Sequence, residues 1–273
     1  MTTIDTGTED LLARKENGVG YLVMNRPEAR NAMSQEMNKA MQDTIAAFEL
    51  DNEVRCIVLT GAGKGFCAGG DVKGMASRGD GTVGDNTIDA AIHKQRDHQR
   101  STSGKLFKMP KPTIASLSGA AAGAGLSYAL SCDLRIMSSK AFMTTAFAKV
   151  GFSGDYGGSY FMTQLIGSAK ARELYFLSDR ISADQALHLG LTNWIVEPEN
   201  LELKTKEIAE KLASGPAVAF RYMKENLNRA MHGDVDDCLD LEATHHIHCG
   251  QTHDHRNAVK AFVEKKEPVF EGK

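Results

Sequence analysis

The sequence lacks the features that several classes of protein require. Its 273 residues carry 32 lysines and arginines against 35 aspartates and glutamates, so no basic excess is available for a nucleic acid backbone. Five cysteines, an odd number with no CxxC pair, favour free thiols in a reducing compartment over a disulfide framework. The polar, charged stretch from residue 1 to 15 is unlike a secretory signal. These absences predict a cytoplasmic protein that does not bind nucleic acid.

A long apolar run of the kind that crosses a membrane is also missing. Residues 112–132 contain no charged side chain, but they are mostly alanine, glycine and serine, which are too weakly apolar for a span. A buried strand, turn and helix explain this stretch better. We therefore expect no membrane insertion.

Two glycine-rich turns are present instead, Gly65-Phe-Cys-Ala-Gly-Gly-Asp71 and Ser118-Gly-Ala-Ala-Ala-Gly-Ala-Gly125. Each follows an apolar strand-like run, residues 54–60 and 113–117. Because glycine has no side chain, it lets the backbone approach a ligand closely and present its N–H groups. Two such turns can aim two N–H donors at one oxygen, which is how an oxyanion is stabilised. The sequence therefore predicts a site that holds an enolate.

Alternating strand and helix signals predict an α/β fold. Ser34 is expected to cap a helix whose buried face carries Met37, Met41, Ile45 and Phe48. The other expected strands are 19–25, 133–137 and 192–196, and the other expected helices are 87–108, 124–131, 157–166 and 182–190. Residues 79–86, rich in glycine and aspartate, are expected to form a surface loop. Past residue 199 only helical segments remain, at 199–212, 216–230, 235–244 and 254–264.

Several motifs in this order resemble the crotonase superfamily, the enoyl-CoA hydratase/isomerase family. They are residues 25–32 (NRPEARNA), 59–71 (LTGAGKGFCAGGD), 111–115 (KPTIA), 119–127 (GAAAGAGLS), 155–159 (DYGGS) and 261–265 (AFVEK). The resemblance implies a crotonase (ClpP-like) spiral of ββα units over residues 1–200. It also implies a C-terminal helical region, residues 201–273, that builds homotrimers or hexamers made of two trimers. The implied ligand is an acyl-coenzyme A thioester, with no cofactor beyond the coenzyme A of the substrate.

The resemblance also implies the residues of the site. The thioester oxygen would lie between the backbone N–H groups of Gly70 and Ala124. Hydratases of the superfamily place a water with two glutamates, and those two positions carry Ser127 and Phe147 here. Ser127 can donate a hydrogen bond but is a poor base, and Phe147 can only line the pocket. The ordinary hydratase chemistry therefore lacks both of its carboxylates.

One other carboxylate, Asp155, lies where some members of the superfamily keep an aspartate, isomerases and aromatic-CoA dehalogenases among them. In the isomerases this aspartate moves a proton, and in the dehalogenases it attacks the ring. Capping of the following helix is the structural alternative. An apolar setting made by Phe147, Phe152 and Tyr156 would raise the pKa of the carboxyl group above its reference of ~3.9, which suits a proton carrier.

The remaining implied residues line a groove for the substrate. Arg26 and Arg30, together with Lys64, are candidates for the phosphates of coenzyme A, with a solvated surface role as the alternative. The full set of substrate-binding positions is Arg26, Ala29, Arg30, Ala68, Gly69, Asp71, Ala120, Phe147, Phe262 and Lys265, the last two near the nucleotide and supplied by either this chain or a neighbouring subunit.

Two potentially reactive groups receive structural interpretations. Cys67, in the first turn, has no base placed to activate it and is expected to be a small buried residue. The histidines between residues 245 and 255 show no zinc-ligand spacing, so no metal site is expected.

Enoyl-CoA double-bond isomerisation with Asp155 as acid and base is the function that these residues favour. A hydratase with an atypical water site and a non-catalytic acyl-CoA binding protein are the alternatives, and hydrolysis or dehalogenation through an Asp155 ester is a more remote one. The sequence does not indicate the acyl group.

Overall fold

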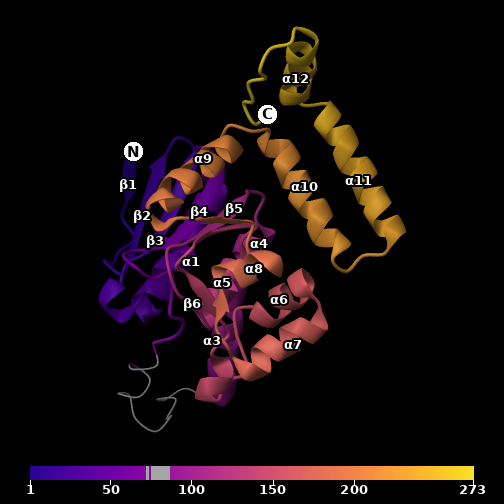
Figure 1. Ribbon diagram of the computed structural model, residues 1–273. Coiled ribbons are helices and arrows are strands. Elements are labelled where there is room, and N and C mark those ends of the chain that lie inside the picture. The colour runs from indigo at the N-terminus through magenta and orange to yellow at the C-terminus, as the bar shows by residue number, and fades with distance from the viewer. Residues whose placement is uncertain (72–73, 75–86) are drawn as a thin grey trace.

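The computed structural model describes residues 1–71, 74 and 87–273, and its centre is a seven-stranded sheet flanked by helices (Figure 1). The loop expected at residues 79–86 lies outside the described residues. The strand order is β1-β2-β3-β4-β5-β7-β10, antiparallel from β1 to β3 and parallel from β3 to β10. The strands are β1 (Thr2–Ile4), β2 (Leu11–Glu16), β3 (Val19–Met24), β4 (Cys56–Gly61), β5 (Thr113–Leu117), β7 (Leu134–Ser138) and β10 (Trp194–Val196).

A second, three-stranded sheet stands beside the carboxyl end of β5. It consists of β6 (Ala121–Ala122), β8 (Phe142–Thr144) and β9 (Ile181–Ser182), with β6 and β8 parallel and β8 and β9 antiparallel. Because β6 belongs to the second glycine-rich turn, this small sheet fixes the turn relative to the rest of the chain.

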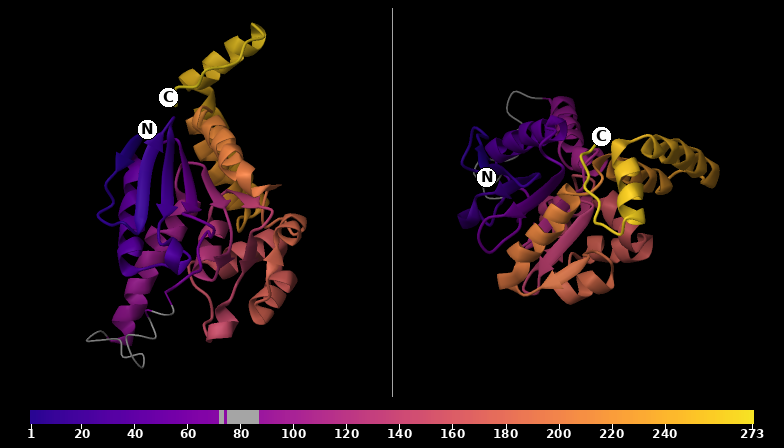
Figure 2. Two further views of the ribbon diagram at one scale, coloured as in Figure 1. Left: turned by 60° about the vertical axis from the view of Figure 1, so that its left-hand side comes forward. Right: turned by 90° about the horizontal axis from the view of Figure 1, so that it is seen from above.

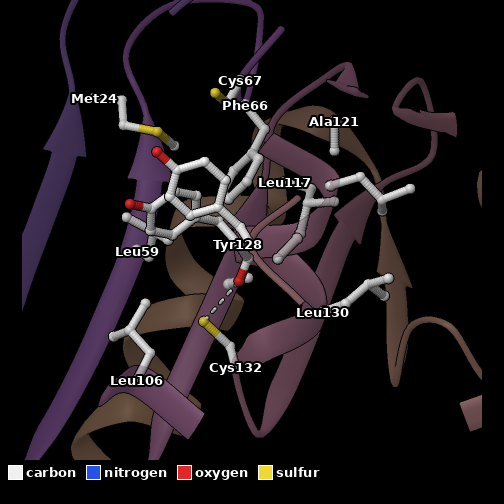
Figure 3. Packing of buried hydrophobic residues seen from close by; sticks show 14 of the residues in the cluster. Met24, Leu59, Phe66, Cys67, Leu106, Leu117, Ala121, Tyr128, Leu130 and Cys132 are labelled. Atoms are coloured by element: carbon white, nitrogen blue, oxygen red, sulfur yellow. Dashed lines mark hydrogen bonds between the residues drawn. The ribbon is translucent and has the colours of Figure 1, made fainter. Parts of the chain in front are cut away.

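The parallel strands are buried on both faces, so they read as continuous apolar runs rather than alternating ones. One face packs on α9 (Leu201–Ala213), where Tyr21, Val58 and Ile114 meet Leu201 and Ala209. The opposite face packs on α1 (Gln35–Leu50), α4 (Ser103–Lys108) and α5 (Ala124–Ser131). Figure 3 shows side chains buried between the sheet and these helices, where Tyr128 of α5 lies among Met24, Leu59 and Leu117 of the strands.

The predicted α1 is confirmed in its cap and in its buried face. The Met37 N–H donates to the Ser34 hydroxyl oxygen at 3.0 Å, and all four predicted apolar side chains are buried. The single helix expected over residues 87–108 is wrong, because the chain forms α3 (Ile88–Ser101) and α4 with a break at Thr102. Thr102 has φ −117° and ψ −94°, outside the helical region, and its hydroxyl donates to the carbonyl of His98.

The remaining helices follow the predicted order with shifted ends. Short 3-10 turns occur at η1 (Pro27–Ala29), η2 (Phe147–Val150) and η3 (Pro198–Asn200). The α-helices are α6 (Gly158–Ile166), α7 (Ser168–Leu177), α8 (Ala183–His188), α10 (Ala217–Ala230), α11 (Val235–Gly250) and α12 (His253–Val263). The prediction of α11 was too short, because it ended at residue 244 and the helix continues to Gly250.

Helices α10, α11 and α12 extend from one side of the body, whereas α3 lies at the opposite end of the molecule (Figures 1 and 2). A partly buried ion pair joins α10 to the body. The Lys224 ammonium donates to Asp133 at 2.8 Å and to the carbonyls of Leu106 and Lys111. In the described part of the chain, no helix is both long enough and apolar enough to span a bilayer.

Candidate active site

The two glycine-rich turns meet because their parent strands are parallel neighbours. β4 and β5 run side by side, with Thr60 opposite Ser116, so both strands end at the same edge of the sheet. Beyond them, the Cys67 N–H donates to the Ala120 carbonyl at 3.0 Å, and the Ala122 N–H donates to the Cys67 carbonyl at 2.9 Å. Two segments about fifty residues apart in the sequence are thereby held side by side.

Glycine is required where these turns touch. Gly69 has φ +91°, and a Cβ added there would lie 2.8 Å from the Ala122 oxygen and 3.3 Å from the Ala124 nitrogen. At Gly125 an added Cβ would lie 2.4 Å from the Cys67 oxygen. Real Cβ atoms do not tolerate the shorter contacts, so any side chain at either position would push the turns apart. The start of α5 therefore approaches the first turn closely.

The two amides predicted for the oxyanion site, those of Gly70 and Ala124, are available to a ligand. Met33 forms a parallel bridge to Gly70 by donating to the Gly69 carbonyl at 2.8 Å, a pattern that leaves the N–H of Gly70 pointing away from Met33. Ala124 is the first residue of α5, where an amide has no partner within the helix. Among the described residues neither amide donates to a protein acceptor, and both line one pocket of about 490 Å³.

Asp155 lines the same pocket as the two amides. Its carboxylate oxygen Oδ1 is buried and has no hydrogen-bond partner in the described part of the chain. The alternative role as a helix cap is wrong: α6 begins at Gly158, its N-cap residue is Gly157, and no side chain caps it. An unpartnered buried carboxylate is costly to keep, and such groups cluster at functional sites.

Burial raises the pKa of Asp155 from its ordinary 3.8 to about 6, in the predicted direction. The titratable groups whose charges couple to it are the phenols of Tyr128, Tyr156 and Tyr175 and the thiol of Cys67. All of these groups are neutral at pH 7, so none of them offsets the effect of burial in the described part of the chain. The carboxyl group can therefore exchange a proton near neutral pH.

Two of the three side chains predicted to surround Asp155 are buried, and the third is not. Phe147 is buried and stacks on Tyr175 with 6.0 Å between ring centroids, and Tyr156 is buried as predicted. Phe152 is 58% exposed, so it does not cover the carboxylate within this chain. Its place is taken by Tyr175, which no sequence pattern singles out because it lies on α7, about twenty residues further along the chain.

Ser127 is a packing residue rather than a lining residue of this pocket. It is 1% exposed, and its hydroxyl donates to the Gly123 carbonyl at 3.4 Å. A Cβ on Gly158 would lie only 2.3 Å from the Ser127 oxygen. Because Ser127 is small and Gly158 has no side chain, the loop that carries Asp155 can pack closely against α5.

Only some of the residues predicted for the substrate groove lie together beside this pocket. Gly69, Ala68, Ala29 and Ala120 lie in the adjoining turns, where the Ala68 N–H donates to the Arg30 carbonyl at 3.0 Å. The Arg30 side chain is exposed.

Arg26 lines the pocket, but its guanidinium is already paired with two carboxylates. It lies 3.5 Å from Asp10 and 3.2 Å from Asp71, and it also donates to the Ala32 carbonyl. Asp71, predicted as a substrate-binding position, in turn accepts from the Gly74 N–H at 2.9 Å.

Phe262 and Lys265 lie away from the pocket. Phe262 belongs to α12 and is 84% exposed, and α12 stands at the end of the molecule opposite α3 (Figures 1 and 2). Neither residue lines the cavity that Asp155 lines.

Several residues that line the pocket could not be predicted from the sequence. Gln35, Glu36 and Asn38 come from the polar face of α1, and Gln95 comes from α3. Polar residues on the outer faces of amphipathic helices are ordinary, so only the fold shows that these ones face the pocket.

The interpretation of Cys67 as a small buried residue agrees with the structure. Cys67 is fully buried, and burial raises the pKa of its thiol to about 12, so it is not a ready nucleophile. Among the described residues, no group of three or more histidine, cysteine, aspartate or glutamate side chains is arranged to hold a metal ion. His245 instead contacts Asn226 and Glu225 on α10 and stacks on Tyr222.

Comparisons with known proteins point in one direction. The family model for enoyl-CoA hydratase/isomerase matches residues 14–273. The chain is 36% identical to the short-chain-enoyl-CoA hydratase of Clostridium acetobutylicum, over 94% of this chain and 95% of that protein. It is 34% identical to the 1,2-epoxyphenylacetyl-CoA isomerase of Escherichia coli, over 97% and 99%. The crystal structure of an enoyl-CoA hydratase from Bacillus anthracis superposes with a TM-score of 0.88 at 29% identity, covering 97% of this chain and all of that one.

Proposed function

Because the chain belongs to the enoyl-CoA hydratase/isomerase family, we propose that it moves the double bond of an enoyl-CoA thioester, with Asp155 as both base and acid. Membership makes the chain an enzyme of acyl-CoA metabolism with the predicted α/β fold. Relatives named as hydratases and relatives named as isomerases match it about equally well, so the choice between these activities must come from the site.

The observation that carries the proposal is one unpartnered carboxylate in the pocket of two unpartnered amides. Asp155 Oδ1 is buried without a hydrogen bond, and the Gly70 and Ala124 amides line the same cavity. Two N–H donors on the thioester oxygen lower the energy of the enolate, typically by ~3–4 kcal/mol for each donor. A proton on the carbon next to the thioester then becomes acidic enough for a carboxylate to remove.

The reaction follows from these parts. With a 3-enoyl-CoA, the Asp155 carboxylate takes a proton from C2, and the electron pair spreads through the dienolate onto the thioester oxygen. The carboxylic acid so formed returns the same proton to C4, which leaves the 2-enoyl-CoA and restores the carboxylate. No water is consumed. A pKa of about 6 suits both steps, because the group is mostly ionised at pH 7 yet holds a proton long enough to return it.

The two positions that carry the water-binding glutamates in hydratases support the same choice. Ser127 is buried and bonded within its own helix, and Phe147 is an apolar wall stacked on Tyr175. Neither side chain can take a proton from water at neutral pH. We propose that the reaction needs no cofactor beyond the coenzyme A of the substrate.

The assembly proposed from the family is a homotrimer or a pair of trimers. Phe262 and Lys265 are remote from the pocket of their own chain, so they can reach a bound coenzyme A only from a neighbouring subunit. Sedimentation of the purified protein measures the assembly directly.

Asp155→Asn tests the function. We expect isomerisation of a 3-enoyl-CoA, followed by ultraviolet absorbance of the conjugated product, to fall by about 10²–10⁴-fold, the usual contribution of a general acid–base group. Glu36→Gln is the matched control, since Glu36 is a carboxylate that lines the same pocket. The control should keep the wild-type rate. Undiminished turnover by the Asp155 variant would remove that residue from the role.

Mass spectrometry of the products separates the alternatives. Isomerisation leaves the mass of the acyl-CoA unchanged, whereas hydration of a 2-enoyl-CoA adds one water. Loss of hydration in Glu36→Gln together with normal activity of Asp155→Asn would favour a hydratase with an atypical water site. Tight binding of acyl-CoA esters without turnover at any chain length would favour a binding protein.

A further inference from the structure

The residue that follows Asp155 has an unusual backbone conformation. Tyr156 has φ +49°, in the left-handed region that bulky residues rarely occupy. Gly154 and Gly157, which flank the Asp155-Tyr156 pair, also have positive φ, +111° and +80°, but glycine adopts such values freely. The direction of the Asp155 side chain therefore depends on whatever holds Tyr156 in this conformation.

Two consecutive residues of α3 hold it. The Gln99 side-chain oxygen accepts a hydrogen bond from the Tyr156 N–H. The His98 Nδ1 lies 2.9 Å from the Tyr156 hydroxyl, and the His98 Nε2 lies 3.0 Å from the Asn38 carbonyl oxygen of α1. Since a carbonyl can only accept, Nε2 carries a proton, and in the tautomer with Nδ1 unprotonated that nitrogen accepts from the tyrosine hydroxyl.

The ring of Tyr156 is enclosed from two sides. His98 meets it edge to face, with 5.7 Å between centroids and an angle of 84°, and Tyr128 of α5 packs at 5.1 Å. Tyr156 is 4% exposed, although α3 itself has no fully buried residue. Helix α3 thus reaches the site through His98 and Gln99, whose side chains are half-buried among exposed neighbours.

We propose that His98 and Gln99 are positioning residues, which clamp Tyr156 in its left-handed conformation and so keep the Asp155 carboxylate in the pocket of the two amides and out of water. The inference rests on the proposed function, because it assumes that Asp155 transfers the proton. Neither His98 nor Gln99 would touch the reacting atoms. Both act through Tyr156, one on its backbone and one on its ring.

Gln99→Leu and Gln99→Glu form a matched pair that tests the backbone bond. Leucine cannot accept the Tyr156 N–H, whereas glutamate keeps an acceptor oxygen at the same place. We expect kcat of Gln99→Leu to fall by about 10- to 100-fold, the effect of a displacement of about 1 Å in a catalytic group, with a smaller change in KM. Gln99→Glu should restore most of the rate, and Arg100→Ala, an exposed neighbour on α3, should match the wild type.

The pH profile supplies a readout that a general loss of packing would not move. In the wild type, kcat/KM should decline as the pH falls through about 6, where Asp155 takes up its proton. In Gln99→Leu the carboxylate gains water, so the acid limb should move to lower pH. A carbon-13 titration of the labelled Asp155 carboxyl follows the same change without turnover. An unmoved limb and an unmoved titration in a folded variant would overturn the proposal.

The tyrosine bond is tested by a double-mutant cycle. His98→Phe keeps a ring against Tyr156 but loses the hydrogen bond, so in a Tyr156→Phe background it should lower kcat no further than Tyr156→Phe alone. A further tenfold loss would mean that His98 takes part in the chemistry itself and would overturn its assignment as a positioning residue. Circular dichroism identifies any variant that fails to fold, and Tyr156→Phe and Gln99→Glu, which retain the size of the side chain, then carry the test.

The same variants distinguish a failure of the proposed function from a failure of the clamp. If Asp155→Asn keeps its isomerase activity, the proposed function fails, and the carbon-13 titration still reports whether the clamp holds the carboxylate. If Asp155→Asn is inactive while Gln99→Leu and His98→Phe behave as the wild type in rate, pH profile and titration, only the clamp fails.

Discussion

Replacing Asp155 by asparagine should stabilise the folded protein at neutral pH while it removes the proposed catalytic group. The pKa of this carboxyl group is raised to about 6 in the folded protein, against 3.8 in an exposed chain. A group with a raised carboxyl pKa binds its proton more tightly when folded, so its ionisation destabilises the fold. Asparagine has nearly the same shape and no charge, and it escapes this penalty.

The magnitude follows from the difference between the two pKa values. Multiplied by about 1.36 kcal/mol per pH unit, the difference corresponds to roughly 3 kcal/mol at pH values above about 6. Asp155 is partly open to solvent, which screens its charge, so we expect a gain of about 1–3 kcal/mol in the free energy of unfolding. The gain should shrink as the pH falls from about 6 and vanish below about 4, where the group is protonated in both states.

Urea denaturation of the two proteins, at equal protein concentration and at about pH 8 and about pH 4, measures this difference. Glu36→Gln, which removes an exposed carboxylate, should show no comparable gain at either pH. An Asp155→Asn protein that is less stable than the wild type at pH 8, or whose advantage does not depend on pH, would refute the reasoning. It would mean that the carboxylate has a favourable partner in the folded state.

Three other outcomes are expected. Ala124→Pro deletes an amide at the first position of α5, where proline is tolerated, so kcat should fall by about 10²–10³-fold while the circular dichroism spectrum stays helical. Lys224→Met breaks a partly buried ion pair with Asp133, so urea denaturation should show a loss of about 1–3 kcal/mol, and an unchanged midpoint would contradict the packing of α10. Cys67 should resist iodoacetamide in the native protein at pH 8 and react only after unfolding, as peptide mass spectrometry can show, because burial raises the pKa of its thiol to about 12.

The sequence determined the parts of the site that depend on local backbone geometry. Glycine is the only residue that fits where Gly69 and Gly125 contact the neighbouring turn, so the glycines in the sequence are enough to locate the two turns. The parallel strands before them can be recognised as apolar runs, whereas the register of β4 with β5 is seen only in the structure, because a strand buried on both faces has no polar–apolar alternation. Asp155 could be selected because it stands in a motif, and the absence of carboxylates at Ser127 and Phe147 needs no structure to be seen.

Tertiary structure alone decided what surrounds Asp155. A carboxyl pKa depends on the solvent and the groups around it, and here these include Cys67 of the first turn, Tyr128 of α5 and Tyr175 of α7, which are distant in the chain. The same aspartate could have capped a helix, and only the position of α6 removes that role. His98, Gln99 and Tyr156 form a unit because α3 lies against one turn with a left-handed residue, and no local sequence pattern shows that these distant segments meet. Local conformation can be read from neighbouring letters, whereas desolvation and long-range hydrogen bonds exist only once the chain has folded.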